Sequence, residues 1–362
     1  MFDKKTHFSR LAILVALAGI GIQASLPVKA KTNIPQPAQN QYPLHLAIST
    51  STPNIAKSTT RLTFNDVQGG AASAAKTVTI SNTGNANLTI NSLTISGTNA
   101  NQFLITSKPT LPVTLAAGSS TTVGIAFNPT TIGPKGGSLQ IKSNDPDTSV
   151  ATVNVRGLGT NGLGGGNEPS LQWILDTCEI PIKVGDPDPT NNSLPTTKPL
   201  GDEVILPQFE KAGTGTVTIE PIAVFGPQSS SGIVTRFGYY SSGNASSKKQ
   251  LFTVSNANYQ SLRPSVSGSR SFDPGTSNFS FYSIWPFFNN RNVYGEDQLN
   301  RFTGAIPHHV RVYRLKDLNG TVVPNAYIVA TEENTSGFDY QDIVVIVRNV
   351  KPATTVILES MR

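Results

Sequence analysis

The densest group of acidic side chains lies in residues 332–342, which read Glu-Glu-Asn-Thr-Ser-Gly-Phe-Asp-Tyr-Gln-Asp. Calcium takes about six to eight hard oxygen ligands, so carboxylates in a glycine-containing loop suit it. Strands are predicted on both sides of this loop, and they would hold its ends together. We therefore expect a calcium site formed by Glu332, Glu333, Asp339 and Asp342. The alternative is a solvated hairpin whose carboxylates accept hydrogen bonds in turns.

Aromatic residues make up only 7% of the chain, yet many of them fall between residues 279 and 294. Strand alternation assigns the first of these to a core. Exposed rings beside polar groups offer contact area to a sugar ring or to the apolar patch of a protein. The binding surface that we expect consists of Trp285, Phe287, Phe288, Arg291 and Tyr294. The alternative is that these rings also belong to the core.

Sequence motifs of catalysis are missing: there is no Gly-x-Ser-x-Gly, no His-Glu-x-x-His and no phosphate-binding glycine loop. Cys178 is the only cysteine, and its apolar neighbours indicate a packed thiol and no disulfide within the chain. We expect a protein that is not an enzyme. The alternative is a secreted polysaccharide hydrolase, because a pair of carboxylates leaves no local signature. The candidate acids of this hydrolase are Glu296, Asp297, Glu332, Glu333, Asp339 and Asp342. Glu296 and Asp297 could also complete the calcium shell if the fold brings them close to the loop.

The first thirty residues have the three-part layout of a secretory signal. Three basic residues precede an uncharged run from Leu11 to Ile22, and Val28-Lys29-Ala30 gives the small-residue spacing of a cleavage site. The apolar run is shorter than the roughly 20 residues of a membrane-spanning helix. We expect residues 1–30 to be a signal peptide and the mature protein, without a transmembrane segment, to be extracellular, on the cell surface or in the periplasm.

The charge of the chain argues against a role in nucleic-acid binding. Residues 1–30 hold four basic residues and one acidic residue, so their removal lowers the formal net charge from +6 to +3. Charged residues are only 14% of the chain, and no basic block follows the signal, whereas nucleic-acid binders concentrate lysine and arginine on one face. We expect a monomer whose partner is a polysaccharide or an envelope or surface protein.

Two linkers divide the remaining chain into two all-β domains. Residues 31–58 are rich in Pro, Gln, Ser and Thr, a composition that favours disorder, and residues 161–167 form a glycine-rich linker. Between them, residues 59–160 show apolar residues at every second position, which is typical of strands with one buried face. These strands are predicted at 78–80, 88–90, 93–95, 103–105, 113–115, 123–127, 139–141 and 153–155. Their number and spacing predict an immunoglobulin-like sandwich.

Several separated motifs in this domain carry a resemblance. They are Leu62-Thr63-Phe64, Thr79-Ile80-Ser81-Asn82-Thr83-Gly84, Phe127-Asn128-Pro129-Thr130, Ile141-Lys142-Ser143-Asn144-Asp145-Pro146 and Val155-Arg156-Gly157-Leu158-Gly159. Residues 59–160 thereby resemble the bacterial choice-of-anchor D domain, a relative of the abnormal-spindle/Hydin (ASH) type of immunoglobulin-like domain. The resemblance implies a spacer or protein-binding unit without catalytic residues.

Residues 168–352 form the second domain, followed by a tail at 353–362. Its predicted strands are 217–220, 235–240, 279–282, 310–313, 327–330 and 343–347, and the last is apolar enough to be buried on both faces. The size of the domain predicts a larger β-sandwich or jelly roll. Motifs such as Arg236-Phe237-Gly238-Tyr239-Tyr240 resemble a domain of unknown function found in secreted bacterial surface proteins. In that family the motif near residues 338–342 usually has an acidic residue before the Asp-aromatic pair and Asn before the final Asp. This chain has Phe338 and Gln341 at these two positions.

Overall fold

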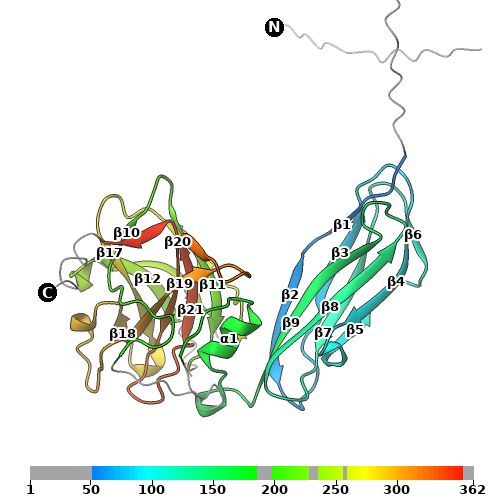
Figure 1. Cartoon of the computed structure of the whole chain (residues 1–362). Helices are drawn as coiled ribbons and strands as arrows, with labels where there is room; N and C mark the ends of the chain where they lie inside the picture. The colour runs from blue at the N-terminus through cyan, green and yellow to red at the C-terminus, as the bar shows by residue number, and fades with distance from the viewer. Residues whose placement is uncertain (1–50, 186–197, 228–234, 256–258, 354–362) are drawn as a thin grey trace, which may run out of the picture. The chain divides into compact units, whose positions relative to one another are not determined.

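The computed structural model describes residues 51–185, 198–227, 235–255 and 259–353, which form two β-sandwiches (Figure 1). The predicted signal peptide, linker residues 31–50 and tail residues 354–362 lie outside the described residues. Each sandwich is described by itself. Within the described ranges, no helix is both long enough and apolar enough for a membrane span.

The N-terminal sandwich packs a four-stranded sheet, in the order β1-β3-β7-β5, against a five-stranded sheet, in the order β2-β9-β8-β4-β6. Their strands are β1 (Ile55–Lys57), β2 (Arg61–Val67), β3 (Lys76–Asn82), β4 (Leu88–Ser96), β5 (Phe103–Ser107), β6 (Val113–Leu115), β7 (Ser120–Phe127), β8 (Gly133–Ser143) and β9 (Val150–Thr160). A short 3-10 turn, η1 (Ala100–Gln102), precedes β5. The expected immunoglobulin-like sandwich is confirmed.

Two details of this sandwich differ from the expectation. Strand β1 pairs with β3 and precedes residue 59, so the domain begins inside the segment that we expected to be a linker. The strands expected at 88–90 and 93–95 are one strand, β4, because a bulge between Ile90 and Ser92 returns Leu93 to the core face.

The core of the N-terminal sandwich contains a group of three phenylalanines. The ring centroids of Phe103 and Phe127 lie 5.0 Å apart, and Phe64 packs against both rings. Gly157 on β9 faces Phe127 so closely that a Cβ atom there would lie 2.4 Å from the ring. A glycine is therefore required at this position by packing.

The C-terminal sandwich also has two sheets. One has the order β15-β13-β12-β17-β10-β22, with β18 on β17, and the other has the order β14-β11-β21-β20-β19, with β16 on β11. The strands are β10 (Phe209–Lys211), β11 (Val217–Val224), β12 (Thr235–Ser241), β13 (Lys249–Val254), β14 (Ser261–Leu262), β15 (Ser267–Gly268), β16 (Ser271–Phe272), β17 (Phe279–Trp285), β18 (Arg291–Tyr294), β19 (Val310–Lys316), β20 (Val322–Thr331), β21 (Ile343–Arg348) and β22 (Val350–Pro352). All six expected strands are present.

Buried residues cover both faces of β21. Ile343, Val345 and Val347 belong to the core between the two sheets, whereas Val344 and Ile346 face the second core. The second core also contains the short helix α1 (Leu171–Thr177), whose first turn is capped by the Ser170 hydroxyl. The expectation that this strand is buried on both faces is confirmed.

Three connections bring the candidate site residues together at one end of this sandwich. Residues 332–342 join β20 to β21, and the 3-10 turn η5 (Pro286–Phe288) joins β17 to β18. The third connection, which contains Glu168, follows the turn η2 (Gly165–Asn167) and precedes α1. The described residues also contain the 3-10 turns η3 (Ala245–Ser247) and η6 (Asp297–Leu299).

Candidate functional site

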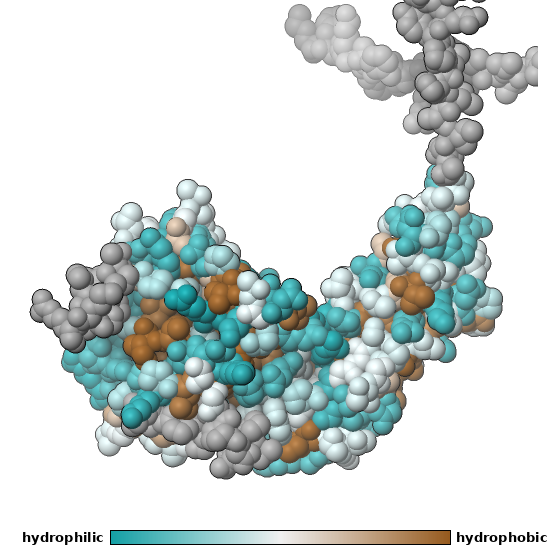
Figure 2. Space-filling view, viewed as in Figure 1, coloured by the Kyte–Doolittle hydropathy of each residue, from teal (hydrophilic) through white to brown (hydrophobic). Residues whose placement is uncertain are grey.

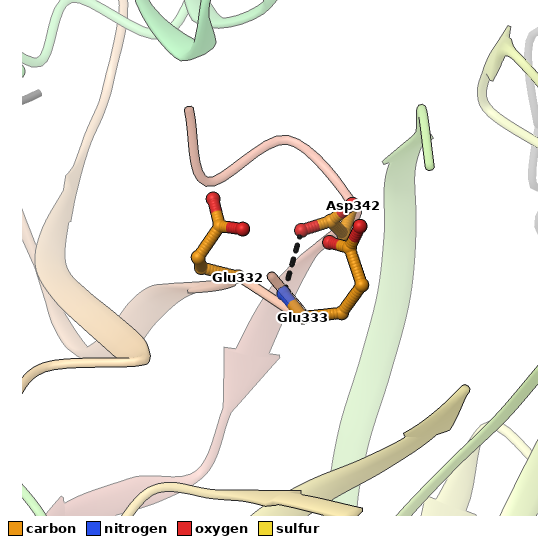
Figure 3. Close-up of side chains that lie close together, drawn as sticks. All are labelled: Glu332, Glu333 and Asp342. Carbon is orange, nitrogen blue, oxygen red and sulfur yellow. Dashed lines mark hydrogen bonds between the residues drawn. The ribbon is translucent and has the colours of Figure 1, made fainter. Parts of the chain in front are cut away.

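Three of the four predicted ligands form a compact group of buried carboxylates. Glu332, Glu333 and Asp342 each offer an oxygen atom, and these oxygens all lie within 4.8 Å of one another. In Figure 3 the carboxyl groups of Glu333 and Asp342 lie side by side, with that of Glu332 facing them. The fourth predicted residue, Asp339, lines the same pocket. The loop therefore brings together the acids that the sequence analysis named.

Glu332 organises the backbone of the loop. Its Oε1 accepts a hydrogen bond from the backbone N–H of Asn334 at 2.8 Å, and its Oε2 accepts from those of Asp339 at 2.8 Å and Tyr340 at 3.2 Å. Tyr340 has a φ of 59°, a left-handed conformation that is rare for a bulky residue. The Glu332 carboxylate thus stabilises a strained turn next to Asp339 and Asp342, both of which line the pocket.

Glu333 and Asp342 supply the least satisfied oxygens. The backbone N–H of Glu333 donates to Asp342 Oδ2 at 3.0 Å, but Glu333 Oε2 is buried and accepts no hydrogen bond from any residue that the structure describes. Only 5% of Glu333 and 2% of Asp342 are exposed. A buried carboxylate oxygen without a donor is costly unless a proton or a cation joins it.

Gly226 makes room for this arrangement. A Cβ atom at residue 226 would lie 2.7 Å from Asp342 Oδ1 and 2.8 Å from the Trp285 ring. The Asp342 carboxylate is therefore confined between the end of β11 and β17.

Glu168 completes the group and was not named from the sequence. Its carboxylate accepts hydrogen bonds from the side-chain amides of Gln260 and, at 3.3 Å, Gln341. It lines the same pocket as the acids of the loop. Gln341 is one of the two positions at which the loop departs from the resemblance, and here its amide connects the loop to Glu168. No local motif marks Glu168, because it is brought to the site only by the fold.

Burial raises the pKa of all five acids. It raises the pKa of Glu168 to about 7 and that of Glu332 to about 8, and the carboxylate of Glu333 adds to both shifts. Burial also raises the pKa of Glu333, and burial followed by neighbouring carboxylates places the pKa values of Asp339 and Asp342 well above the usual range. No lysine, arginine or histidine of the described ranges lines the pocket. The site therefore favours a bound cation or bound protons.

The pocket around these acids has a volume of about 480 Å³. Phe287 and Phe288 form an apolar wall, with their ring centroids 5.0 Å apart at a steep angle, and Asn334 and Ser336 belong to the polar wall. Phe287 is 55% exposed. In Figure 2 the exposed apolar residues form separate small groups in a largely hydrophilic surface.

The expected aromatic surface is only partly exposed. Trp285 is fully buried, with its ring N–H donating to Ser283 Oγ at 2.9 Å, and Tyr294 is buried among other tyrosines. Both expectations of exposure were wrong, because Trp285 packs into the core between the two sheets and Tyr294 packs against Tyr240 and Tyr282. What remains of the predicted surface at the pocket is Phe287 and Phe288.

Arg291 serves the loop and not the surface. Its guanidinium lies 4.5 Å from the ring centroid of Phe288 and 4.7 Å from that of Phe302. Its Nη1 donates to the backbone oxygen of Glu333 at 2.8 Å. Arg291 therefore helps to position the backbone of Glu333 while it packs on Phe288.

The remaining sequence candidates lie apart from the pocket. Glu296 is fully buried and accepts hydrogen bonds from the Gln208 amide and, at 2.8 Å, from the backbone of Gly243. Asp297 accepts from the backbone N–H of His308 at 2.8 Å, beside a separate pocket of about 110 Å³. The structure therefore does not bring these two acids into the shell of the expected calcium site.

The buried thiol of Cys178 has its pKa raised to about 11 by burial, as expected for a packed cysteine.

Comparison with known proteins identifies one part of the chain. Residues 52–160 match the family described as Cep192 domain 4. No curated protein matches the chain. A protein of unknown function from Porphyromonas gingivalis is similar to it at 18% identity, over 31% of this chain and 50% of that protein, with a TM-score of 0.26. The chain thus spans half the length of that structure.

Two further solved structures are similar over limited ranges. The ASH/PapD-like domain 7 of human CEP192 has 11% identity, over 38% of this chain and 99% of that domain, with a TM-score of 0.25. The Escherichia coli chaperone DraB has 13% identity, over 31% of this chain and 58% of that protein, with a TM-score of 0.24. The family match and the two-sheet fold of residues 52–160 agree with the resemblance stated from the motifs. The N-terminal sandwich is therefore an ASH-type immunoglobulin-like domain.

Proposed function

We propose that residues 168–352 form a calcium-dependent binding module, with the ion held by Glu333, Asp342 and Glu332 and with Asp339 and Glu168 beside it. The observation that carries the proposal is the buried Glu333 Oε2, which accepts no hydrogen bond in the described part of the chain while it faces two other carboxylates. A cation at this point would supply the missing partner.

The chemistry of the ligands favours calcium over other common metals. All five side chains offer oxygen, whereas zinc sites are built mainly from cysteine and histidine. Magnesium requires a nearly ideal octahedral shell and keeps several waters, but calcium accepts irregular shells of about six to eight oxygens. Carboxylates from a loop and from a distant segment form an irregular set of this kind.

The whole chain then acts as an exported binding and structural protein. The ASH-type sandwich serves as a spacer or protein-binding unit, and the C-terminal module carries the ligand-binding surface. Residues 1–30 support export by their sequence pattern alone. Fractionation of the producing cells checks this part: full-length chain that retains Met1 in the cytoplasm would refute export.

Thermal unfolding with and without calcium tests the metal site. A ligand that binds only the folded state stabilises it by about 2.7 kcal/mol at 100 times its dissociation constant, so calcium should raise the midpoint and a chelator should lower it. Both tryptophans of the chain, Trp173 and Trp285, lie in the C-terminal module. Trp285 is buried in the core of this module, so its fluorescence follows the module within the intact protein.

Two substitutions provide the matched comparison. Glu333→Gln should abolish most of the calcium-dependent rise in the midpoint, because it removes a charge and a ligand oxygen. Glu296→Gln changes another buried carboxylate of the same module, and it should leave the calcium-dependent rise intact even if the baseline falls. A midpoint that does not respond to calcium in the native protein would disprove the site.

A second candidate function, polysaccharide hydrolysis, is favoured by one observation: the acids line a pocket beside Phe287 and do not lie on a convex surface. Incubation of the protein with polysaccharides and measurement of new reducing ends tests it. Turnover that is lost in Glu333→Gln would support an enzyme, and binding without turnover would support the binding module.

A further inference from the structure

The pocket is larger than a cation site requires. One water molecule takes about 30 Å³ in the liquid, so a calcium ion with a few bound waters fills only part of a volume of about 480 Å³. Besides the carboxylates, the lining of this space includes Phe287 and Phe288. A ligand that reaches the ion would therefore also contact an apolar wall.

The charge of the pocket restricts the class of ligand. Five carboxylates line it, and no basic side chain of the described residues does. When three or more of these carboxylates are ionised, a single divalent cation leaves the lining with a net negative charge, which disfavours an anionic ligand such as a phosphate or a uronic acid. Neutral ligands that coordinate calcium through hydroxyl oxygens carry no such penalty.

The lining contains groups that suit both parts of a sugar, its C–H groups and its hydroxyls. Phe287 is largely exposed and offers an aromatic face to the C–H groups of a sugar. Asn334 and Ser336 also line the pocket, and their side chains can exchange hydrogen bonds with ring hydroxyls.

We propose that the C-terminal module binds a neutral sugar residue, two adjacent hydroxyls of which complete the calcium shell while the ring packs on Phe287. This inference rests on the calcium site proposed above. The concave pocket and the small number of exposed rings in it favour one sugar ring over the flat apolar patch of a protein.

Binding of neutral glycosides to the chain without residues 1–30 tests the inference. The probes are the methyl glycosides of mannose, galactose and glucose, each compared with a deoxy analogue that lacks one of two adjacent hydroxyls, and methyl glucuronide is the anionic control. Isothermal titration should detect binding of at least one neutral glycoside to the calcium-saturated protein. Chelation, loss of the hydroxyl or the anionic group should each weaken binding at least about tenfold.

Two variants separate this inference from the calcium site. Phe287→Ala should weaken glycoside binding about tenfold or more and leave the calcium-dependent rise in the unfolding midpoint unchanged. Leu318→Ala, a change of another exposed apolar residue in the hairpin at the other end of β20, should alter neither quantity. Calcium stabilisation without binding of any neutral glycoside would overturn the sugar inference alone. Glycoside binding that survives chelation or Phe287→Ala would also overturn it.

Discussion

At the scale of single residues, the site requires a residue without a side chain at position 226. Gly226 lacks the Cβ that would collide with Asp342 Oδ1 at 2.7 Å and with the Trp285 ring. Gly226→Ala should therefore displace the Asp342 carboxylate, reduce calcium stabilisation and lower the midpoint even in chelator. Fluorescence-detected unfolding in both conditions measures these effects. Gly243→Ala is the control, because a Cβ there meets no atom within 4 Å, although its φ of 74° adds backbone strain.

The ionisation of the site gives a pH dependence with a definite sign. The folded pKa values of about 7 for Glu168 and about 8 for Glu332 lie above the usual 4.5. Their contribution to stability is then fully present below about pH 4.5 and is lost as the pH rises through 7 and 8. Calcium-free protein should be less stable at pH 8.5 than at about pH 6, whereas saturating calcium should remove this decline. An unchanged or rising midpoint without calcium would contradict this assignment.

The sequence was sufficient for the four loop acids, because residues 332–342 place them within a few positions of each other. It was insufficient for Glu168, whose approach depends on the hydrogen bonds of Gln260 and Gln341. The expected exposure of Trp285 failed for a related reason. Alternation describes one strand, but this ring is buried by the second sheet, which packs over it and brings Gly226 close to it.

At the scale of elements, β19 supports the loop through a buried ion pair. Arg311 on β19 donates to Glu203 Oε2 at 2.6 Å, both side chains are almost fully buried, and the guanidinium lies 4.3 Å from the ring centroid of Tyr340. His308 Nδ1 lies 3.5 Å from the other oxygen of Glu203. The pair thus contacts the residue whose left-handed backbone shapes the site.

Removing one partner of this pair should be costly. Arg311→Met leaves the Glu203 carboxylate buried without its main counter-charge, for which a loss of about 3–5 kcal/mol in the free energy of unfolding is typical. Urea unfolding followed by tryptophan fluorescence measures it. The double variant with Glu203→Gln should recover a large part of the loss. If the double variant is no more stable than Arg311→Met, the cost arises from packing and not from the charge.

Most strands were predictable, because alternation records which face of a strand is buried. The errors occurred where a strand is too short to alternate, as in β1, or where a bulge changes the phase, as in β4. Pairing order was not predictable at all, since it depends on contacts between residues far apart in the sequence.

At the scale of the whole molecule, the chain combines an ASH-type sandwich with a larger module that holds all the proposed ligand chemistry. The first sandwich is identified by its family match, and its described residues form an ordinary apolar core. The second is built around two cores and brings five acids together at one pocket.

The pairing of β2 with β9 determines how the first sandwich would respond to tension. These strands run parallel, with Arg61 opposite Asn154 and Val67 opposite Thr160. A pull on the chain before β2 and after β9 would therefore slide the two strands past each other and strain their hydrogen bonds together, instead of opening them one by one. In force spectroscopy the sandwich should rupture at a higher force when it is pulled before β2 and after β9. It should rupture at a lower force when it is pulled before β2 and at the β8–β9 turn. Equal rupture forces in the two geometries would contradict this mechanical role.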